Sequence, residues 1–113
     1  MDYLFVIWEG GQDAETADRG DVMHDMLAWT AGLVEQGSLR GGAPLQASGQ
    51  ARSVRSRGGA ASATDGPYAE TKEVIGGFCL IDAPSMDEAV AIAQSCPAAR
   101  YGGVEIREIL PMQ

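Results

Sequence analysis

The sequence predicts one α+β domain that spans residues 1–113. Short apolar segments of strand length alternate with two longer segments whose apolar residues recur at helical spacing. Glycines and prolines separate these segments, and no repeat, linker or low-complexity stretch interrupts them. A chain of 113 residues is long enough to bury one modest hydrophobic core.

The first part of the chain predicts a strand and then a long helix. Residues 2–8 alternate one apolar set with another, so both faces of this strand are apolar: Tyr3, Phe5 and Ile7 against Leu4, Val6 and Trp8. The helix is expected to start in the acidic residues 13–18 and to end near Gln36, with Gly37 as its stop. Its apolar positions are spaced by one, three and four residues: Val22, Met23, Met26, Leu27, Thr30, Leu33 and Val34.

The rest of the chain predicts five further strands and a second helix. An irregular strand with a bulge is expected over 39–46, and strands 51–57 and 60–64 form a hairpin around Gly58 and Gly59. A strong strand is expected over 75–82. Ser85 and Glu88 form a capping box for a helix that Pro97 ends, and residues 104–110 form the last strand.

This order of elements is that of a ferredoxin-like β-α-β-β-α-β unit with an inserted β-hairpin. Two helices cover only one face of such a sheet, yet the strands at 2–8 and 75–82 are apolar on both faces. A second copy of the chain is the simplest cover, so we expect a homodimer. A charged residue at a sheet position on the partner side, such as Phe5 or Phe78, is expected to dissociate or unfold the protein.

Charge and composition exclude several classes of partner. The net charge of −8 disfavours nucleic acid, because phosphate contacts need a basic face. No apolar run is long enough to cross a membrane, and the N-terminus carries no secretory signal pattern, so we expect a cytoplasmic protein. Cys79 and Cys96 match no metal or redox spacing and are expected to be small buried side chains without a disulfide.

Residues 40–57 gather basic charge on an otherwise acidic chain. They contain Arg40, Arg52, Arg55 and Arg57 and no acid. Two interpretations stay open. The arginines can mark a solvated strand edge that discourages aggregation, or they can form a small anion site or a docking surface for an acidic partner.

The segment 65–77 is the most specific pattern in the chain. It reads Asp65-Gly66-Pro67-Tyr68-Ala69-Glu70-Thr71-Lys72-Glu73-Val74-Ile75-Gly76-Gly77 and leads into an apolar strand. This pattern resembles the signature loop of the YCII-related, or DGPF-domain, family, with Tyr68 where the family usually has phenylalanine. The N-terminal strand, the helix that carries His24, the segment 42–45 and the ending after Cys96 resemble that family too.

The resemblance implies a dimeric α/β barrel, in which two sheets pack face to face. It also implies a candidate site, because family members carry a histidine near this point of the first helix and a histidine–aspartate pair in a cleft is the family's proposed site. His24 is the only histidine of the chain, and an imidazole titrates near neutral pH, so it is the natural general base or acid. A partly exposed helix histidine with no role is the plainer interpretation.

Three carboxylates could orient His24. Asp25 is adjacent in sequence, but neighbouring helix residues do not face each other, and Glu35 lies three helical turns away. Asp65, at the head of the signature loop and at a strand end, is therefore the preferred partner, although it can equally be a turn residue. We expect the two side chains to meet at the mouth of a cleft bordered by Tyr68 and Arg40.

The remaining loop residues could hold a ligand. Glu70, Thr71 and Lys72 supply an acceptor, a hydroxyl and a cation, and with Arg40 and Tyr68 they could bind a small polar or carboxylated molecule, or they could form a solvated connection. The glycines 76 and 77 let a ligand or another backbone approach a strand face. No phosphate loop, dinucleotide fingerprint, zinc motif or nucleophile elbow is present, so neither a cofactor nor a metal is expected.

Two functions remain in view. One is a non-catalytic small-ligand-binding or regulatory module, since the resemblance implies a link to pathways of extracytoplasmic-function sigma factors. The other is a cofactor-free acid–base enzyme that eliminates or isomerises a small organic molecule, with His24 moving the proton and Asp65 orienting it. Some relatives of this kind are linked to dehydrochlorination.

Overall fold

The computed structural model describes residues 1–10, 19–67 and 73–111. The helices and strands follow the predicted order along the chain: β1 Asp2–Gly10, α1 Arg19–Glu35, β2 Leu39–Pro44, β3 Arg52–Arg57, β4 Ala60–Asp65, β5 Glu73–Asp82, α2 Met86–Gln94 and β6 Gly103–Glu108. Short 3₁₀ turns, η2 Ser48–Gln50 and η3 Pro97–Arg100, follow β2 and α2. The predicted start of the first helix, at 13–18, lies outside the described residues.

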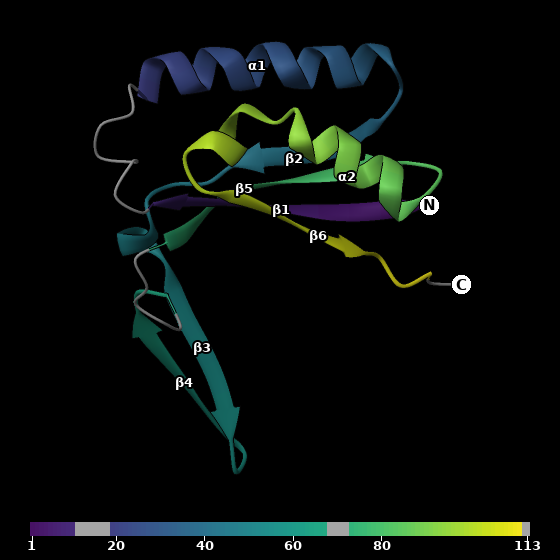
Figure 1. Ribbon diagram of the computed structural model, residues 1–113. Coiled ribbons are helices and arrows are strands. Elements are labelled where there is room, and N and C mark those ends of the chain that lie inside the picture. The colour runs from purple at the N-terminus through teal and green to yellow at the C-terminus, as the bar shows by residue number, and fades with distance from the viewer. Residues whose placement is uncertain (11–18, 68–72, 112–113) are drawn as a thin grey trace.

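Four of the strands form an antiparallel sheet in the order β2-β5-β1-β6. Both helices lie on one face of this sheet, and β3 and β4 form a separate two-stranded hairpin that leaves the sheet on its other side (Figure 1). The protein is thus a mixed α+β domain with a helix layer, a sheet layer and a projecting hairpin.

The hydrophobic core lies between the sheet and the helices. Tyr3, Phe5 and Ile7 of β1 face Ile81, Cys79 and Gly77 of β5 and are buried. The helix layer covers them with a smaller set of buried side chains: Leu33, Ala89, Ala93, Cys96 and Ala98. The small residues of α2 let it approach the sheet closely, and both cysteines are free and buried, as predicted.

Helix α1 uses only part of its predicted apolar stripe for the core. Leu33 is buried, and Met26 and Trp29 pack against the core. The other side of the stripe faces away: Met23, Leu27 and Val34 are 49%, 63% and 59% exposed. Gly37 ends the helix at a φ of +75°. The Gly37 and Ser38 N–H groups bond the carbonyls of Val34 and Leu33 at 3.0 and 2.9 Å, a Schellman cap.

The face of the sheet that the helices leave uncovered is apolar at its centre. We call it the open face. Because side chains alternate along a strand, it carries the second apolar set of β1 and its partners on β5: Leu4, Val6, Trp8, Ile75, Phe78 and Leu80. Glu105 and Arg107 of β6 lie opposite Val6 and Leu4 at its edge. Phe5 was expected as one example of a partner-facing residue; it is fully buried under the helices, so only Phe78 belongs to this face.

The hairpin β3–β4, residues 52–65, projects from the open-face side of the sheet, and we call it the arm (Figure 1). Its turn residues Gly58 and Gly59 have φ angles of +58° and +82°, as the predicted two-residue turn requires. Its base is fixed by the Ser53 hydroxyl, which donates to the Gly66 carbonyl at 2.6 Å, and by the Gly66 N–H, which bonds the Ala51 carbonyl. Ser53 is the one buried residue in these two strands.

The fold depends on a close approach between β1 and the turn before β6. A Cβ atom added at Gly102 would collide with the carbonyl of Trp8, whereas one at Gly103 would meet no heavy atom within 4 Å. Gly102→Ala is therefore expected to lower the free energy of unfolding by about 2 kcal/mol or more, and Gly103→Ala by no more than about 0.5 kcal/mol. Urea unfolding of both variants measures this, and equal losses would contradict the packing described here.

Candidate functional site

A cavity of about 400 Å³ lies between α1 and the end of the sheet where β1 ends and β5 begins. Its volume lies in the range of small-molecule sites. Apolar side chains and bare backbone form most of its wall: Ile7, Trp8, Gly10, Val22, Met23, Met26, Leu27, Leu39, Gly42, Ala43, Pro44, Leu45, Gly76, Gly77, Phe78, Cys79 and Ala98. The exposed side of the α1 stripe, Met23 and Leu27, therefore borders a hollow.

Few of the described residues that line the cavity have polar side chains. They are Glu9, Thr30 and Tyr101. The Thr30 hydroxyl donates to the Leu27 carbonyl at 3.0 Å, so its proton is already used. The Arg100 guanidinium lies 5.8 Å from the centre of the Tyr101 ring, within cation–π range. An apolar wall with one carboxylate and one phenol suits a small, largely apolar molecule with one or two polar substituents.

Gly76 and Gly77 shape this cavity from the sheet side. The register of β1 and β5 shifts after Ile7, so that Gly77 pairs with Ile7 and Ile75 with Trp8, which leaves Gly76 in a bulge. The Glu9 side chain occupies the space that a Cβ of Gly76 would need. A Cβ at Gly77 would stand 3.0 Å from the Ala43 carbonyl oxygen, so this glycine admits the β2 backbone. Of the two predicted uses of the glycine pair, close backbone approach is therefore the one found at Gly77.

His24 is not among the residues that line the cavity. Its side chain is exposed on α1, as expected for a position one step off the apolar stripe. It stands three residues before Leu27, and residues at this spacing are neighbours on a helix surface. Leu27 lines the cavity, so one surface neighbour of His24 belongs to the cavity wall.

The structure does not bring His24 and Asp65 together. Asp65 ends β4 at the base of the arm, is almost fully exposed, and has its carboxylate 3.9 Å from the Arg52 guanidinium. The other two carboxylates considered as partners of His24 do not contact it either. Asp25 contacts Arg100 at 3.4 Å, and Glu35 lies at the far end of an unbroken helix. The single chain therefore shows no contact between His24 and Asp65, and their pairing stays a prediction.

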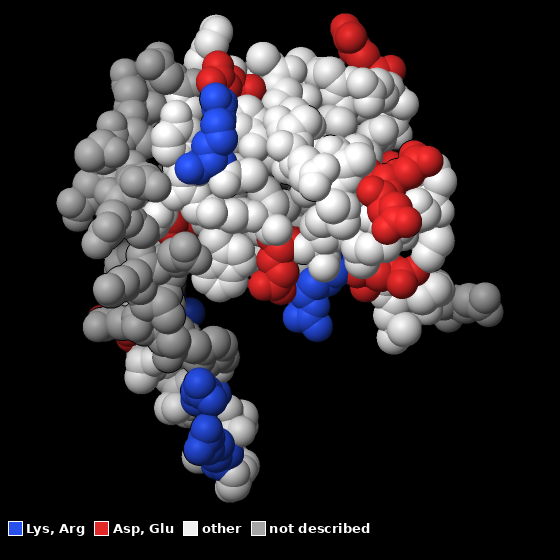
Figure 2. All heavy atoms as spheres, in the orientation of Figure 1, with Lys and Arg blue, Asp and Glu red and all other residues white. Residues whose placement is uncertain are grey.

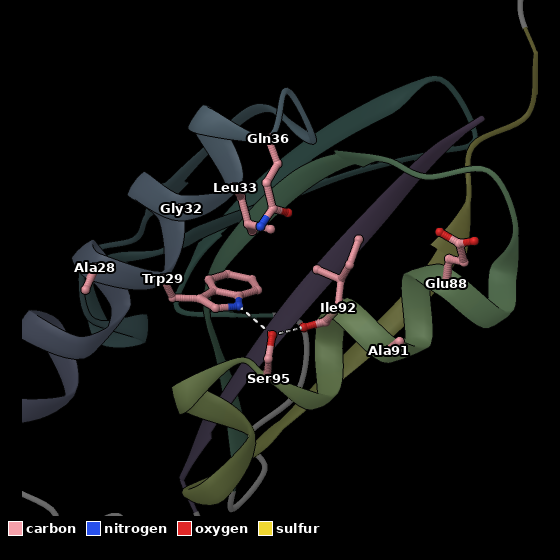
Figure 3. A pocket seen from close by; sticks show the side chains of 9 residues that line it. All are labelled: Ala28, Trp29, Gly32, Leu33, Gln36, Glu88, Ala91, Ile92 and Ser95. Atoms are coloured by element: carbon pink, nitrogen blue, oxygen red, sulfur yellow. Dashed lines mark hydrogen bonds between the residues drawn. The ribbon is translucent and has the colours of Figure 1, made fainter.

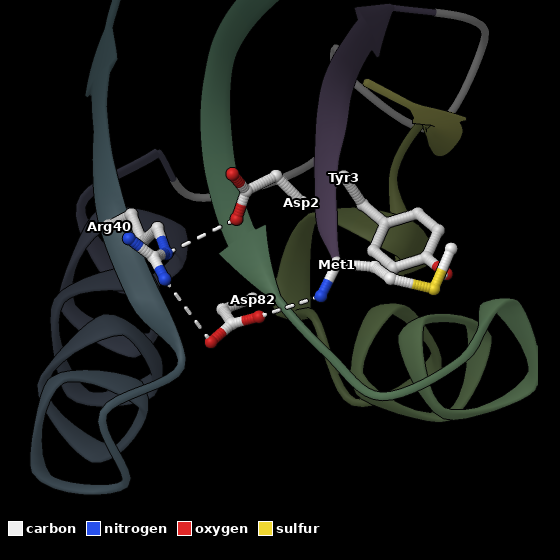
Figure 4. Close-up of polar contacts among 5 residues, drawn as sticks. All are labelled: Met1, Asp2, Tyr3, Arg40 and Asp82. Atoms are coloured by element: carbon white, nitrogen blue, oxygen red, sulfur yellow. Dashed lines mark hydrogen bonds and ion pairs between the residues drawn. The ribbon is translucent and has the colours of Figure 1, made fainter. Parts of the chain in front are cut away.

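Arg40 belongs to an ion-pair cluster at the other end of the sheet (Figure 4). Its guanidinium contacts Asp2 at 3.2 Å and Asp82 at 3.5 Å, and the Met1 ammonium contacts Asp82 at 3.1 Å. Hydrogen bonding and charge from that ammonium, with a smaller part from Arg40, lower the pKa of Asp82. On β5 the cavity is lined by Gly76 to Cys79, whereas the cluster uses Asp82, the last residue of that strand. The predicted cleft bordered by Tyr68 and Arg40 stays a prediction, because Tyr68 lies outside the described residues.

The other predicted ligand-binding residues, Tyr68, Glu70, Thr71 and Lys72, lie outside the described residues. The arginines of 40–57 do not form one patch, because Arg40 lies with the cluster on the sheet whereas Arg52, Arg55 and Arg57 belong to the arm. In the three described ranges, no three His, Cys, Asp or Glu side chains gather as a metal site would need.

A second hollow lies between α1 and α2 (Figure 3). It has a volume of about 570 Å³ and runs along the outer surface of both helices. The Trp29 indole N–H crosses it and donates to the Ser95 hydroxyl at 2.9 Å, which donates to the Ile92 carbonyl at 2.6 Å. This chain of hydrogen bonds ties the two helices together, and none of the predicted site residues lines the groove.

Cys79 lines the cavity, and the burial of its thiol keeps it unreactive. Burial, with a smaller part from Cys96, raises the pKa of the Cys79 thiol to about 11. Burial also raises the pKa of the Cys96 thiol. Neutral thiols are poor nucleophiles, so these groups serve as packing atoms at neutral pH.

Sequence reasoning missed most residues that form the cavity. Met23 and Met26 were assigned to the core stripe, and Glu9 received no role. The signals were present in the glycine pair at 76–77 and in the second apolar face of the strand at 2–8, but only the bulge shows that they meet at one end of the sheet.

None of the described helices is long and apolar enough to cross a membrane.

Comparison with known proteins gives a family and a fold. An uncharacterised protein of Rhizobium meliloti, R00369, is 39% identical over 90 residues, which cover 78% of this chain and 73% of that protein. A solved structure of 5-chloro-2-hydroxyhydroquinone dehydrochlorinase (TftG) from Burkholderia phenoliruptrix, in complex with 2,5-dihydroxybenzoquinone, superposes with a TM-score of 0.59 at 17% identity and covers 97% of this chain and 94% of that one. The model of the YCII-related domain matches residues 1–113, and the chain belongs to that family.

Proposed function

We propose that the protein binds a small, largely apolar organic molecule in the cavity between α1 and the sheet. The observation that carries the proposal is the hollow itself, with its apolar wall and the polar side chains of Glu9 and Tyr101. A ligand there buries apolar surface, while Glu9 and Tyr101 orient its polar groups. The similar solved structure is a complex with 2,5-dihydroxybenzoquinone, a small ring molecule that is more polar than this wall alone suggests.

A second candidate function is cofactor-free acid–base catalysis on the bound molecule. The position of His24 three residues before Leu27 of the cavity wall supports it, and so does the dehydrochlorinase name of the similar structure. His24 would remove a proton from the substrate as a leaving group departs, and Asp65 would orient the imidazole once it is brought near. A binding or regulatory module, including one in a sigma-factor pathway, is the alternative if His24 has no effect on turnover.

We further propose that two copies pack their open faces together as a dimeric α/β barrel of ferredoxin-like units. The sheet order, read from β6 through β1 and β5 to β2, suits such a unit with the arm inserted. The open face has an apolar centre and a charged edge of Glu105 and Arg107, as protein interfaces do. Half-buried aromatic and aliphatic side chains in one continuous row are costly to leave in water.

Ligand binding is testable through the methionines. Met23 and Met26 line the cavity, whereas Met1 and Met86 do not. With ¹³C-methyl-methionine labelling, titration with 2,5-dihydroxybenzoquinone as probe should shift the Met23 and Met26 signals and leave Met1 and Met86 unchanged. Leu27→Trp, which fills the mouth of the cavity, should abolish the shifts. Val34→Trp, on the same helix and equally exposed, should preserve them. Uniform shifts, or none with any related quinone, would refute the site.

Acid–base catalysis is testable with 5-chloro-2-hydroxyhydroquinone as substrate. Chloride release by the wild type should fall by about 10²–10⁴-fold in His24→Gln, because general base catalysis contributes about that much. Asp65→Asn run in parallel tests the orienting role and should give a smaller loss. The methionine shifts on binding should persist in both variants. Equal rates in His24→Gln and wild type would remove His24 from the chemistry and leave the binding role.

The dimer is testable with one pair of variants. Val6→Asp places a charge on the open face and should raise the dissociation constant by at least about 30-fold, because burying an unpaired carboxylate costs several kcal/mol. Val34→Asp, the same substitution on the outside of α1, should leave the dissociation constant unchanged. Sedimentation equilibrium measures both, and circular dichroism checks that each stays folded. A wild-type constant retained in Val6→Asp would place the interface elsewhere.

A further inference from the structure

We propose that Glu9 selects the ligand of the cavity between α1 and the sheet. Its carboxylate accepts a hydrogen bond from a hydroxyl group, so the molecule bound there is a small alcohol or phenol whose remaining surface is largely apolar. This inference rests on the proposed binding function and adds to it the chemical class of the ligand.

Glu9 stands near the end of β1, on the side of the sheet that the helices cover. Strand β1 lies between β5 and β6, and Glu9 continues the alternate set of side chains that includes Phe5 and Ile7. Phe5 and Ile7 are buried in the core, whereas Glu9 is exposed and lines the cavity. One row of side chains thus passes from the core into the cavity wall and brings a carboxylate there.

Glycines keep the space around Glu9 free on both sides. On β5, the Cγ, Cδ and Oε1 atoms of Glu9 fill the space that a Cβ of Gly76 would need, so the carboxylate lies over the bulge. On the other side, a Cβ at Gly102 would stand 3.2 Å from the Glu9 Cα and would collide with the Trp8 carbonyl. No side chain at these two positions covers the carboxylate, and a ligand that enters the cavity can reach it.

The Glu9 carboxylate has acceptor capacity that the described residues do not use. In the parts of the chain that the structure describes, no hydrogen bond or ion pair involves Glu9. Other acidic groups are spread over the surface of the body, as Figure 2 shows, and several contact a cation: Asp82 contacts Arg40, and Asp25 contacts Arg100. An ionised carboxylate only accepts hydrogen bonds, so a molecule bound beside Glu9 has to supply the donor.

The surroundings of Glu9 favour a hydroxyl over an ammonium group. An ammonium has three donors, and the mostly apolar wall of described side chains offers few acceptors besides Glu9. Positive charge is also present already, because the Arg100 guanidinium lies 5.8 Å from the centre of the Tyr101 ring, and Tyr101 lines the cavity. A hydroxyl has a single donor, which Glu9 alone satisfies.

Two probes of matched shape measure the selection. 4-Methoxyphenol carries one hydroxyl, and 1,4-dimethoxybenzene is its methyl ether without a donor. Titration of the wild type, followed through the methyl signals of Met23 and Met26, gives both dissociation constants. The constant should be at least about fivefold lower for the phenol, because the ether leaves a charged acceptor without its hydrogen bond.

A substitution of Glu9 tests the source of that preference. Glu9→Met keeps the length of the side chain and removes both oxygens. The two dissociation constants should then agree within about twofold, with the ether bound as in the wild type, because only the hydrogen bond is lost. Glu35→Met is the same substitution at an exposed position of α1 outside the cavity wall, and it should keep the preference of the wild type.

Gly76→Ala tests the position of the carboxylate without removing it. Gly76 is not among the glycines with a positive φ, so alanine meets no backbone strain there. The three atoms nearest to its Cβ all belong to the flexible side chain of Glu9, which has to move aside. The preference for the phenol should fall to about twofold or less. This variant decides if Glu9→Met misfolds by circular dichroism.

The outcomes separate selection from binding. Equal affinity of the wild type for the phenol and its ether, or a preference that survives in the folded variants, overturns the role of Glu9 and leaves the binding function standing. Tighter, Glu9-dependent binding of 4-methoxybenzylamine, an ammonium at neutral pH, overturns the hydroxyl class. The absence of methionine shifts with all three probes and with 2,5-dihydroxybenzoquinone overturns both proposals.

Discussion

The packing of one sheet with two apolar faces determines the rest of this structure. Alternation along β1 places Tyr3, Phe5 and Ile7 under the helices and Leu4, Val6 and Trp8 on the opposite side. The helix layer has small residues in α2 and one apolar stripe in α1, enough to cover one face only. Everything that we propose about assembly follows from the face left over, because neither described helix covers its apolar area.

The same sheet creates the candidate site at one of its ends. The bulge at Gly76 shifts the register, makes room for Glu9 and leaves a hollow beneath α1 that neither helix fills. The half of the α1 stripe that the core does not use, Met23 and Leu27, forms the roof of that hollow. Core and site therefore share one helix, and Met26 belongs to both.

Much of the fold could be predicted from the sequence because its signals are local. Gly37 has the positive φ of a helix stop, the Gly58-Gly59 turn has those of a tight hairpin, and the Ser85 hydroxyl accepts the Glu88 N–H as a helix cap does. The site was harder, because it depends on which strand ends meet. Arg40 and Asp65 both lie near the hairpin in sequence, yet the antiparallel pairing of β2 with β5 brings Arg40 to Asp82, the last residue of β5. The number of residues between Arg40 and Asp65 in the sequence does not show how far apart they lie in the fold.

We propose that a second copy of the chain covers the open face. Light scattering on the purified wild-type chain, over a range of micromolar concentrations, measures this directly. The structure predicts the mass of two chains of 11.8 kDa each across that range. A constant mass of one chain would contradict the claim, because Leu4, Val6, Trp8 and Phe78 would then lie uncovered in a stable folded monomer.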